Sequence, residues 1–473
     1  MTKTSPGTRS ESLDALRGLA ILLMVLSGNI HGEHPLPAWM YHAQVGPPNF
    51  IFNPNLPGIT WVDLVFPFFL FAMGMAFPFA MTKKLDAGVS RWRIALQILE
   101  RGLLLTGFAI YLQHIKPFAF ATQPTAVDWL IGLLGFALLF PILLRLPAAW
   151  KPIWRLLLRG GGLVGAAALM LFIRFPDGTG FSVYRSDIII IVLANMSVFG
   201  ALLWLVTRDG ILPRLGVLGV LLAFRLTHGV DGSWNQWIWN FTPAPWMYSF
   251  YYLQYLFIVI PGTIAGDLVY RWTRSTDDPA VRPADGWRSV TVLGVTVLTV
   301  GVNLAGLFTR SLVATAIADG ILCALALWLT TEAGTSLARL HRALVQWGSY
   351  WLLLGICFEV FEGGIKKDHP TLSYYFVTAG LAGFAFTGFS VLVDRFRKTR
   401  SVRLLVENGQ NPMIAYIAGS NLVLPILSLT SIQVLLGVLS SSPWLGFLRG
   451  VFFTALVAIA TSVFTRNRLF WRT

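Results

Sequence analysis

Segments of about 20 mostly apolar residues recur along almost the whole chain, with short charged stretches between them. A run of this length spans a hydrocarbon core roughly 30 Å thick. Of the 473 residues, 55% are apolar and 12% are charged, whereas a soluble domain has about 25% charged residues. No soluble core could bury that much apolar surface. We therefore expect an all-α polytopic membrane protein in which residues 1–473 form a single transmembrane domain.

The apolar segments predict a bundle of about fourteen membrane helices. We expect them at 12–30, 60–81, 94–114, 127–147, 153–174, 187–207, 211–227, 246–271, 287–308, 311–333, 347–363, 372–394, 412–437 and 443–465. The segment 153–174 contains three adjacent glycines, and 211–227 is short. Without that pair the chain has twelve spans and the same orientation.

Lys and Arg gather in loops at alternating ends of the predicted helices, and the loops on the other side hold far fewer of them. This asymmetry indicates that both termini lie on the inner side of the membrane. It also accounts for the net charge of +14 without a nucleic-acid partner. Cys323 and Cys357 lie in apolar segments and match no metal or redox spacing, so we expect no metal site.

Six of the seven histidines fall at or beyond the outer ends of the predicted helices. His31, His34 and His42 share the outer loop 31–59. Imidazole is the side chain best suited to proton transfer near neutral pH. The cluster therefore indicates either a catalytic vestibule or loops that tolerate histidine. The second outer loop, 228–246, is dense in tryptophan, which favours an aromatic belt at the membrane surface or a platform for sugar rings.

Ionisable residues inside membrane segments are costly and are therefore candidates for function. Asp14 and Arg17 share one face of the first helix and can pair there. Asp63 begins the second helix, where a carboxylate can also act as a cap. Asp319 is the deepest lone acid and needs a partner. The chain has no Walker loop, GxSxG or HExxH in a fitting context, which weighs against a hydrolase, a nucleotide-driven pump or a metalloenzyme.

Several motifs together resemble one family, that of heparan-α-glucosaminide N-acetyltransferase and its bacterial relatives. The resemblance rests on SLDALRGLAILLMVL at 12–26, on the histidine loop that follows, and on PGITWVDLVFPFFLFAMG at 57–74. Further matches are RGLLLTGFAIYL at 101–112, IKKDHPTLSYYFVTAG at 365–380 and ENGQNPMIAY at 407–416. The combination of SLDALRG with DLVFPFFLF is the specific part.

The resemblance is strongest over 9–115 and 362–420, and it implies a membrane-embedded acyltransferase. Such an enzyme moves an acetyl group from cytosolic acetyl-CoA to the amine of a glucosamine-type amino sugar at the outer face, without a metal. The partners implied are CoA, the amino sugar and the lipid bilayer. The resemblance also implies a multi-pass protein of the bacterial inner membrane with periplasmic histidine-rich loops. Dimers occur in the resembling family, which leaves a homodimer open.

Site residues follow from the same resemblance. The catalytic candidate is His42, in Tyr41-His42-Ala43, together with Asp63 and Asn29. The stretch between His42 and Asp63 is longer than the resemblance leads us to expect, so His31 and His34 stay open as alternatives. The remaining expectations are Arg17, Arg101, Lys366 and Asn411 for binding CoA, and Trp61, Lys367, Tyr374, His31 and His34 for binding the sugar.

Two other functions remain open from the residues alone. One is a non-catalytic permease for amino sugars, in which the buried ions and aromatic loop would form a sugar pathway. The other is an acyltransferase that modifies an envelope glycan with a different donor. CoA binding would separate the first from the acetyltransferase, and a comparison of acyl donors would separate the second. For the acetyltransferase, we expect His42 to deprotonate the amine, directly or after transient acetylation of its imidazole.

Overall fold

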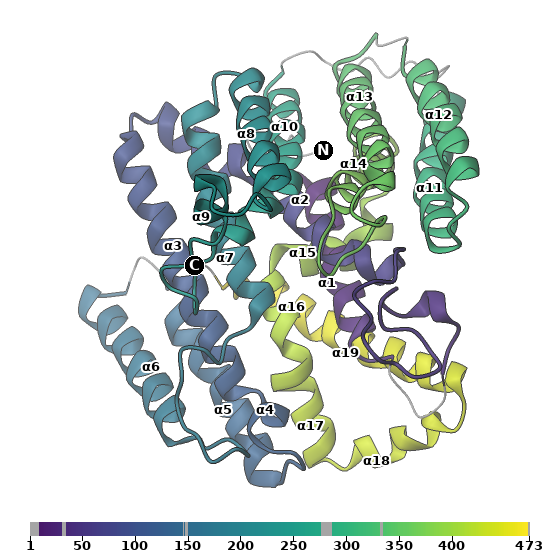
Figure 1. The fold of residues 1–473 in the computed structure, drawn as a ribbon. Coiled ribbons are helices and arrows are strands. Elements are labelled where there is room, and N and C mark those ends of the chain that lie inside the picture. The colour runs from purple at the N-terminus through teal and green to yellow at the C-terminus, as the bar shows by residue number, and fades with distance from the viewer. Residues whose placement is uncertain are drawn as a thin grey trace.

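The structure is a computed structural model that describes residues 9–30, 35–144, 146, 150–275, 286–331 and 334–471. Within these residues the fold is helical and has no β-strand (Figure 1). The α-helices are α1 (Glu11–Ser27), α2 (Trp61–Asp86), α3 (Arg91–Ile115), α4 (Pro117–Phe120), α5 (Ala126–Leu143), α6 (Pro152–Phe172), α7 (Ile188–Thr207), α8 (Ile211–Thr227), α9 (Trp234–Trp239), α10 (Leu256–Thr273), α11 (Gly286–Phe308), α12 (Leu312–Leu329), α13 (Ser336–Cys357), α14 (Leu372–Ser390), α15 (Arg403–Gln410), α16 (Pro412–Ala418), α17 (Leu424–Leu429), α18 (Ile432–Gly437) and α19 (Pro443–Arg466). The 3₁₀ and π segments are η1 (Ala38–Met40), η2 (Phe250–Tyr255), η4 (Phe358–Val360), η5 (Val391–Arg395), η6 (Thr399–Val402), η7 (Gly419–Val423) and η8 (Val438–Ser440).

The all-α membrane fold is confirmed. Among the described residues, 12 helices are long and apolar enough to cross a membrane. The two further predicted segments are helical as well, as α1 and α8, but each has only 17 residues. That length lies at the lower limit for a span. The predicted helix 153–174 is present in full as α6, in spite of its three adjacent glycines.

Two predicted boundaries are wrong. Helix α13 begins at Ser336 rather than near 347, because Thr335 caps it by accepting a hydrogen bond from the Ala338 amide. Its first turns are amphipathic, so a search for apolar runs misses them. The predicted helix 412–437 is interrupted by η7 and ends at Leu429. Ser431 then adopts a left-handed conformation with φ of 59°, which separates α18 from it.

The interior of the bundle is formed by α2, α10 and α14, which are largely buried. In Figure 1 they lie between α6 at one edge and the α11–α12 hairpin at the other. Those outer helices bury only a minor share of their residues and expose large apolar side chains such as Phe172, Val297 and Val313, as expected of helices that face lipid. The N-terminal ends of α2 and α14 therefore present their side chains to a protected environment.

The motif SLDALRG places α1 against α15 and α14. A Cβ added at Gly18 would overlap the Leu405 carbonyl, and one added at Gly409 would overlap the Asp14 carbonyl. Only glycine lets the two backbones approach this closely. Ser12 donates to Asp394 at 2.5 Å, which ties α1 to the end of α14.

The deep acid Asp319 lies in the α11–α12 hairpin. Asn303 donates to its Oδ1 at 2.6 Å, and both residues are fully buried. The partner that the sequence required is therefore an amide rather than a cation. This pair joins the two helices near their connecting turn, and the turn contains Arg310.

Candidate active site

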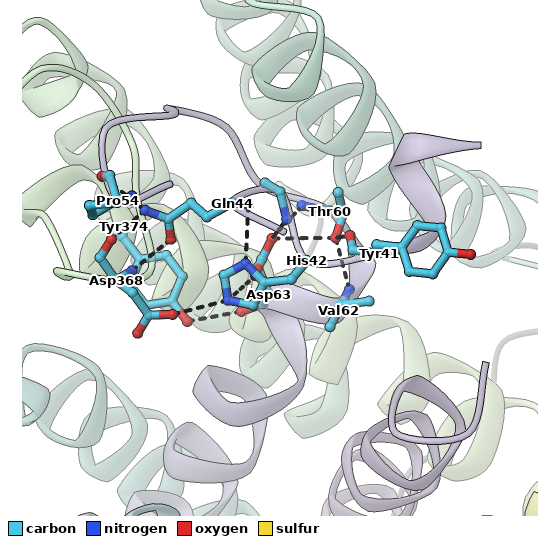
Figure 2. Close-up of polar contacts among 10 residues, drawn as sticks. Tyr41, His42, Gln44, Pro54, Thr60, Val62, Asp63, Asp368 and Tyr374 are labelled. Atoms are coloured by element: carbon cyan, nitrogen blue, oxygen red, sulfur yellow. Dashed lines mark hydrogen bonds and ion pairs between the residues drawn. The ribbon is translucent and has the colours of Figure 1, made fainter. Parts of the chain in front are cut away.

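The loop after η1 and the first turn of α2 together hold Asp63. Asp63 completes a capping box with Thr60: its Oδ2 accepts from the Thr60 amide at 2.9 Å, and the Thr60 side chain accepts from the amide at the start of α2. Oδ2 also accepts from the Ala43 amide at 3.2 Å, which brings the loop onto the helix (Figure 2). One oxygen of Asp63 is thus used for capping, and Oδ1 is left for other contacts.

The imidazole of His42 lies between two carboxylates (Figure 2). Its Nε2 is 3.3 Å from Asp63 Oδ1 and 3.1 Å from Asp368 Oδ2. Neither contact is aligned as a hydrogen bond, so among the described residues Nε2 and Asp63 Oδ1 are buried polar atoms without a hydrogen-bond partner. The backbone amide of Gln44 donates to Nδ1 at 3.2 Å. Nδ1 is therefore the acceptor of the ring, which assigns the proton of the neutral imidazole to Nε2.

Burial differs sharply within this group of three. The Asp63 side chain is 0% exposed, that of His42 16%, and that of Asp368 47%. A molecule approaching from outside the bundle therefore meets Asp368 and the edge of the imidazole first. Two carboxylates beside one imidazole also make the group attractive to a cation such as an ammonium.

Gln44 connects the loop of His42 to the loop of Asp368. Its side chain is completely buried. It accepts from the Asp368 amide at 2.9 Å, donates to the Asp368 carbonyl, and donates to the Pro54 carbonyl at 3.1 Å. The backbone also takes part, because the Gly58 amide donates to the Ile365 carbonyl at 2.7 Å. Gln44 thereby fixes the position of Asp368 against His42.

The segment from Glu359 to Thr371, which we call the Asp368 loop, is anchored by two further ion pairs. Arg310 contacts Glu359, whose Oε1 also accepts from the Ile365 amide at 3.0 Å. Arg225 contacts Glu362 at 2.5 Å and donates to the Pro370 carbonyl at 3.0 Å. The loop is thus held from the α11–α12 turn and from the end of α8.

Burial of Asp368 on its own would raise the pKa of its carboxyl group. The contact with His42 and the positive charge of Lys367 outweigh that effect and leave the pKa below its ordinary value. Asp368 is therefore an anion at neutral pH. Lys367 thus acts on the group through its charge, from the neighbouring position in the chain.

Tyr374 and Trp61 stabilise the same region. The Tyr374 hydroxyl donates to the Asp63 carbonyl at 2.9 Å, so α14 holds the first turn of α2. Trp61 packs with the apolar cluster under the loop that precedes His42. The amide of Lys366 donates to Thr371 at 3.1 Å and shapes the Asp368 loop. Of the residues that the sequence indicated, the structure thus places His42, Asp63, Lys367 and Tyr374 in one region.

Arg17 and Arg101 lie deeper in the bundle than Asp63 and close enough for their charges to interact, and Arg17 donates to the Ala72 carbonyl in the middle of α2 at 3.5 Å. Arg17 contacts Asp14 at 3.4 Å and the Gly409 carbonyl at 3.3 Å. One and two turns beyond these arginines, at Ile21 and Met24 on α1 and at Leu105 and Phe108 on α3, side chains line a narrow apolar cavity of about 30 Å³.

That apolar cavity also borders α2 and a larger chamber. Phe66, one turn inward from Asp63, lines it. Met24 and Tyr416 line both the apolar cavity and a cavity of about 420 Å³, which Asn29 also lines. The two cavities are thus adjacent, and the lining of neither includes Arg17, His42 or Asp63.

Other predicted residues lie apart from the His42 group. The Asn29 amide donates to the Val25 carbonyl at 2.7 Å. Asn411 donates to the Leu469 carbonyl at 2.8 Å and is almost fully buried, so its amide holds the C-terminal segment. His31 and His34 lie outside the described residues.

The tryptophan-rich loop 228–246 contributes one side chain to the interior. Trp239 is buried, lies 4.5 Å from the His228 ring, and has the guanidinium of Arg225 over its own ring at 5.6 Å. Trp234 and Trp237 are exposed, as both an aromatic belt and a sugar platform require.

The sequence hypothesis did not single out Asp368 or Gln44. The sequence could have indicated Asp368, because it belongs to the IKKDHP motif on which the resemblance rests. It directly follows Lys366 and Lys367, which were both named as candidates. Gln44 has no comparable signal, because its role depends on a contact with a residue 324 positions away.

The fold and this group define a multi-pass helical membrane protein with a half-buried histidine–carboxylate centre at one end. Residues 9–269, more than half of the chain, match the family described as a domain of unknown function (DUF5009), and the chain belongs to that family. Part of the chain is also similar to heparan-alpha-glucosaminide N-acetyltransferase. The mouse protein is 32% identical over 104 residues, which is 22% of this chain and 14% of the mouse protein. The human protein is 35% identical over 98 residues, 20% of this chain and 12% of the human protein. The matches therefore span only about a seventh of these relatives.

Proposed function

We propose that this protein is a membrane-embedded acyltransferase that moves an acetyl group from acetyl-CoA to the amine of an amino sugar. The observation that carries the proposal is the contact of the His42 Nε2 with both Asp63 and Asp368 at the end of the bundle. The similarity to proteins named as N-acetyltransferases of a glucosaminide supports the reaction and the class of acceptor.

The acceptor enters as an ammonium ion and is attracted by Asp368, the exposed carboxylate of the group. To act, His42 takes the other tautomer, with its proton on Nδ1, so that the lone pair of Nε2 is free to serve as a base or as a nucleophile, and the two carboxylates stabilise the imidazolium that forms when Nε2 accepts the amine proton. The amine nitrogen forms a bond to the acetyl carbon as the carbon–sulfur bond breaks. Of the two protons that the ammonium loses, one ends on the sulfur of CoA and one leaves through the carboxylates. Direct transfer gives sequential kinetics, and an acetyl-imidazole intermediate gives ping-pong kinetics.

The nucleotide end of acetyl-CoA enters from the inner side, and Arg17 and Arg101, which lie deeper in the bundle than Asp63, offer positive charge to its phosphates. The pantetheine arm follows the apolar cavity between α1, α2 and α3 toward Phe66 and Asp63. That cavity is narrow, so the helices that line it separate slightly when the donor binds. Lys366, Asn29 and Asn411 remain candidate contacts along this route.

The distribution of basic residues supports an orientation with Arg17 on the inner side and His42 on the outer side of a bacterial inner membrane. Transfer then crosses the membrane: the donor stays inside, and the sugar and product stay in the periplasm. A homodimer is compatible with this arrangement, because the His42 group is complete within one chain.

The experiment measures transfer of labelled acetyl groups from acetyl-CoA to glucosamine by the detergent-purified protein. We expect the wild type to form N-acetylglucosamine, and His42→Ala to bind acetyl-CoA without turnover. A wild type that binds no acetyl-CoA refutes the acetyltransferase and favours a permease. Equal turnover by both proteins keeps the reaction and removes His42 from it.

A further inference from the structure

Beside the His42 group lies a second set of buried polar atoms. Within the part of the chain that the structure describes, the Tyr251 hydroxyl, both polar atoms of the Gln254 amide, the Tyr375 hydroxyl and Nε of Arg225 are buried without a hydrogen-bond partner. Gln254 and Tyr375 are almost completely buried. Leaving a buried polar atom unpaired costs free energy, so such atoms seldom gather without a function.

These four side chains share one region. The Tyr251 hydroxyl and the Gln254 amide lie close to each other without forming an aligned hydrogen bond, and Tyr251 is within electrostatic reach of Arg225, Glu362 and Asp368. Tyr375 lies within reach of Tyr251 and Arg225 in turn. They come from three elements, η2, the first turn of α14 and the end of α8. We call them the Gln254 compartment.

The Gln254 compartment adjoins the group formed by His42, Asp63 and Asp368. The Nη2 atom of Arg225 is committed to Glu362 and to the Pro370 carbonyl, both in the Asp368 loop. The free Nε of the same guanidinium is left for another acceptor. Tyr255 packs against Tyr375 at 5.4 Å and against Phe66 at 5.6 Å, so aromatic rings separate the compartment from the apolar cavity beside α2.

Charge divides the region in two. Asp63 and Asp368 give an acidic side, whereas the compartment has one cation, an amide and two hydroxyls. Because the charge of Arg225 is balanced by Glu362, the compartment carries no net charge to attract an ammonium. An amide with a free donor and a free acceptor matches a pair of neighbouring hydroxyl groups, and tyrosine rings pack against the apolar face of a sugar. Both requirements are met by a neutral ring that carries several hydroxyls.

We propose that the Gln254 compartment binds the hydroxyl-bearing ring of the acceptor while the acidic side binds its amine. The inference rests on the proposed acetyl transfer and extends it, because it assigns Gln254, Tyr251 and Tyr375 as the residues that select a sugar over a simple amine. It also fixes the orientation of the ring, with the amine toward Asp368 and the hydroxyls toward Arg225.

The test compares two acceptors of similar ring size, glucosamine and cyclohexylamine, the second without hydroxyls. We expect Tyr375→Phe to lower kcat/KM for glucosamine by roughly fivefold to tenfold, and to leave that for cyclohexylamine unchanged. Gln254→Leu lowers the glucosamine value by about tenfold or more, because it removes two contacts. The melting temperature of ligand-free Tyr375→Phe stays equal or rises, because the hydroxyl it loses is unpaired.

A matched control is Tyr111→Phe, whose hydroxyl donates to the Gly135 carbonyl at 3.0 Å. It lowers the melting temperature and leaves the preference for glucosamine intact. Parallel changes with both acceptors, or no change with either, overturn the inference and mean that the compartment holds water only.

A failure of the proposed function is distinguishable from a failure of this inference. If the wild type transfers no acetyl group, its melting temperature is measured with each amine. A stabilisation specific to glucosamine that Tyr375→Phe abolishes supports the compartment without the reaction. The absence of any shift with glucosamine overturns the compartment too.

Discussion

Replacing Gln44 with leucine removes the hydrogen bonds that link the loop of His42 to the Asp368 loop. The side chains of His42 and Asp368 themselves are unchanged. The substitution keeps the size of the side chain and deletes three hydrogen bonds, two to the Asp368 backbone and one to the Pro54 carbonyl. At about 1 kcal/mol each, these amount to roughly 3 kcal/mol. The equilibrium between a docked and an undocked Asp368 loop then shifts by about 10².

Two measurements report the shift in the docking of the Asp368 loop. Hydrogen exchange of the amides in the Asp368 loop becomes faster in Gln44→Leu, and kcat/KM for acetyl transfer falls by up to about 10². Both ion pairs that hold the loop remain, so the fall is smaller if they suffice to dock it. Because Gln44 touches no substrate, the pH dependence of the remaining activity keeps the shape it has in the wild type.

The control for this variant is Gln236→Leu, which removes hydrogen bonds to Asp231 and to the Gly232 amide in the other outer loop. It leaves both the exchange of the Asp368 loop and the activity unchanged. If Gln44→Leu exchanges at the wild-type rate and retains full activity, the loop does not depend on Gln44 and the reasoning is refuted.

Three further predictions concern stability. Gly18→Ala forces α1 away from α15 and costs about 1–3 kcal/mol or more, so the melting temperature falls; an unchanged value contradicts the close approach. Asn303→Leu leaves the buried Asp319 carboxylate without its amide donor and lowers stability by about 1–3 kcal/mol, whereas the double variant with Asp319→Leu recovers most of that loss. Asp368 has a lowered pKa in the folded state, so its contribution is fully present above the ordinary value of 3.8 and disappears as the pH falls through the lower folded value. Asp368→Asn is therefore less stable than the wild type from pH 7 down to that value, and a difference that closes well above it contradicts the shift.

The fold class followed from the sequence because lipid imposes a simple rule: about 20 apolar residues make one span. Each of the fourteen predicted segments contains a helix among the described residues. The two boundary errors occur where the apolar-run rule does not apply. The first turns of α13 carry Arg339, His341 and Arg342 and do not register as a span, and the break at Ser431 depends on a local backbone conformation.

The site was predictable only in part, for a different physical reason. His42 and Asp63 lie in motifs, and their contact follows from a loop that folds back on its own helix. Asp368 and Gln44 meet across the whole sequence, and the Gln254 compartment unites three elements that are far apart in the chain. Such contacts are set by the packing of α10 and α14, which no local pattern encodes.

The most direct test uses proteoliposomes with labelled acetyl-CoA sealed on the side of Arg17 and glucosamine on the side of His42. We expect labelled N-acetylglucosamine to form on the His42 side with the wild type, and none with His42→Ala. Product that forms only when both substrates share one side of the membrane would contradict transfer through the bundle.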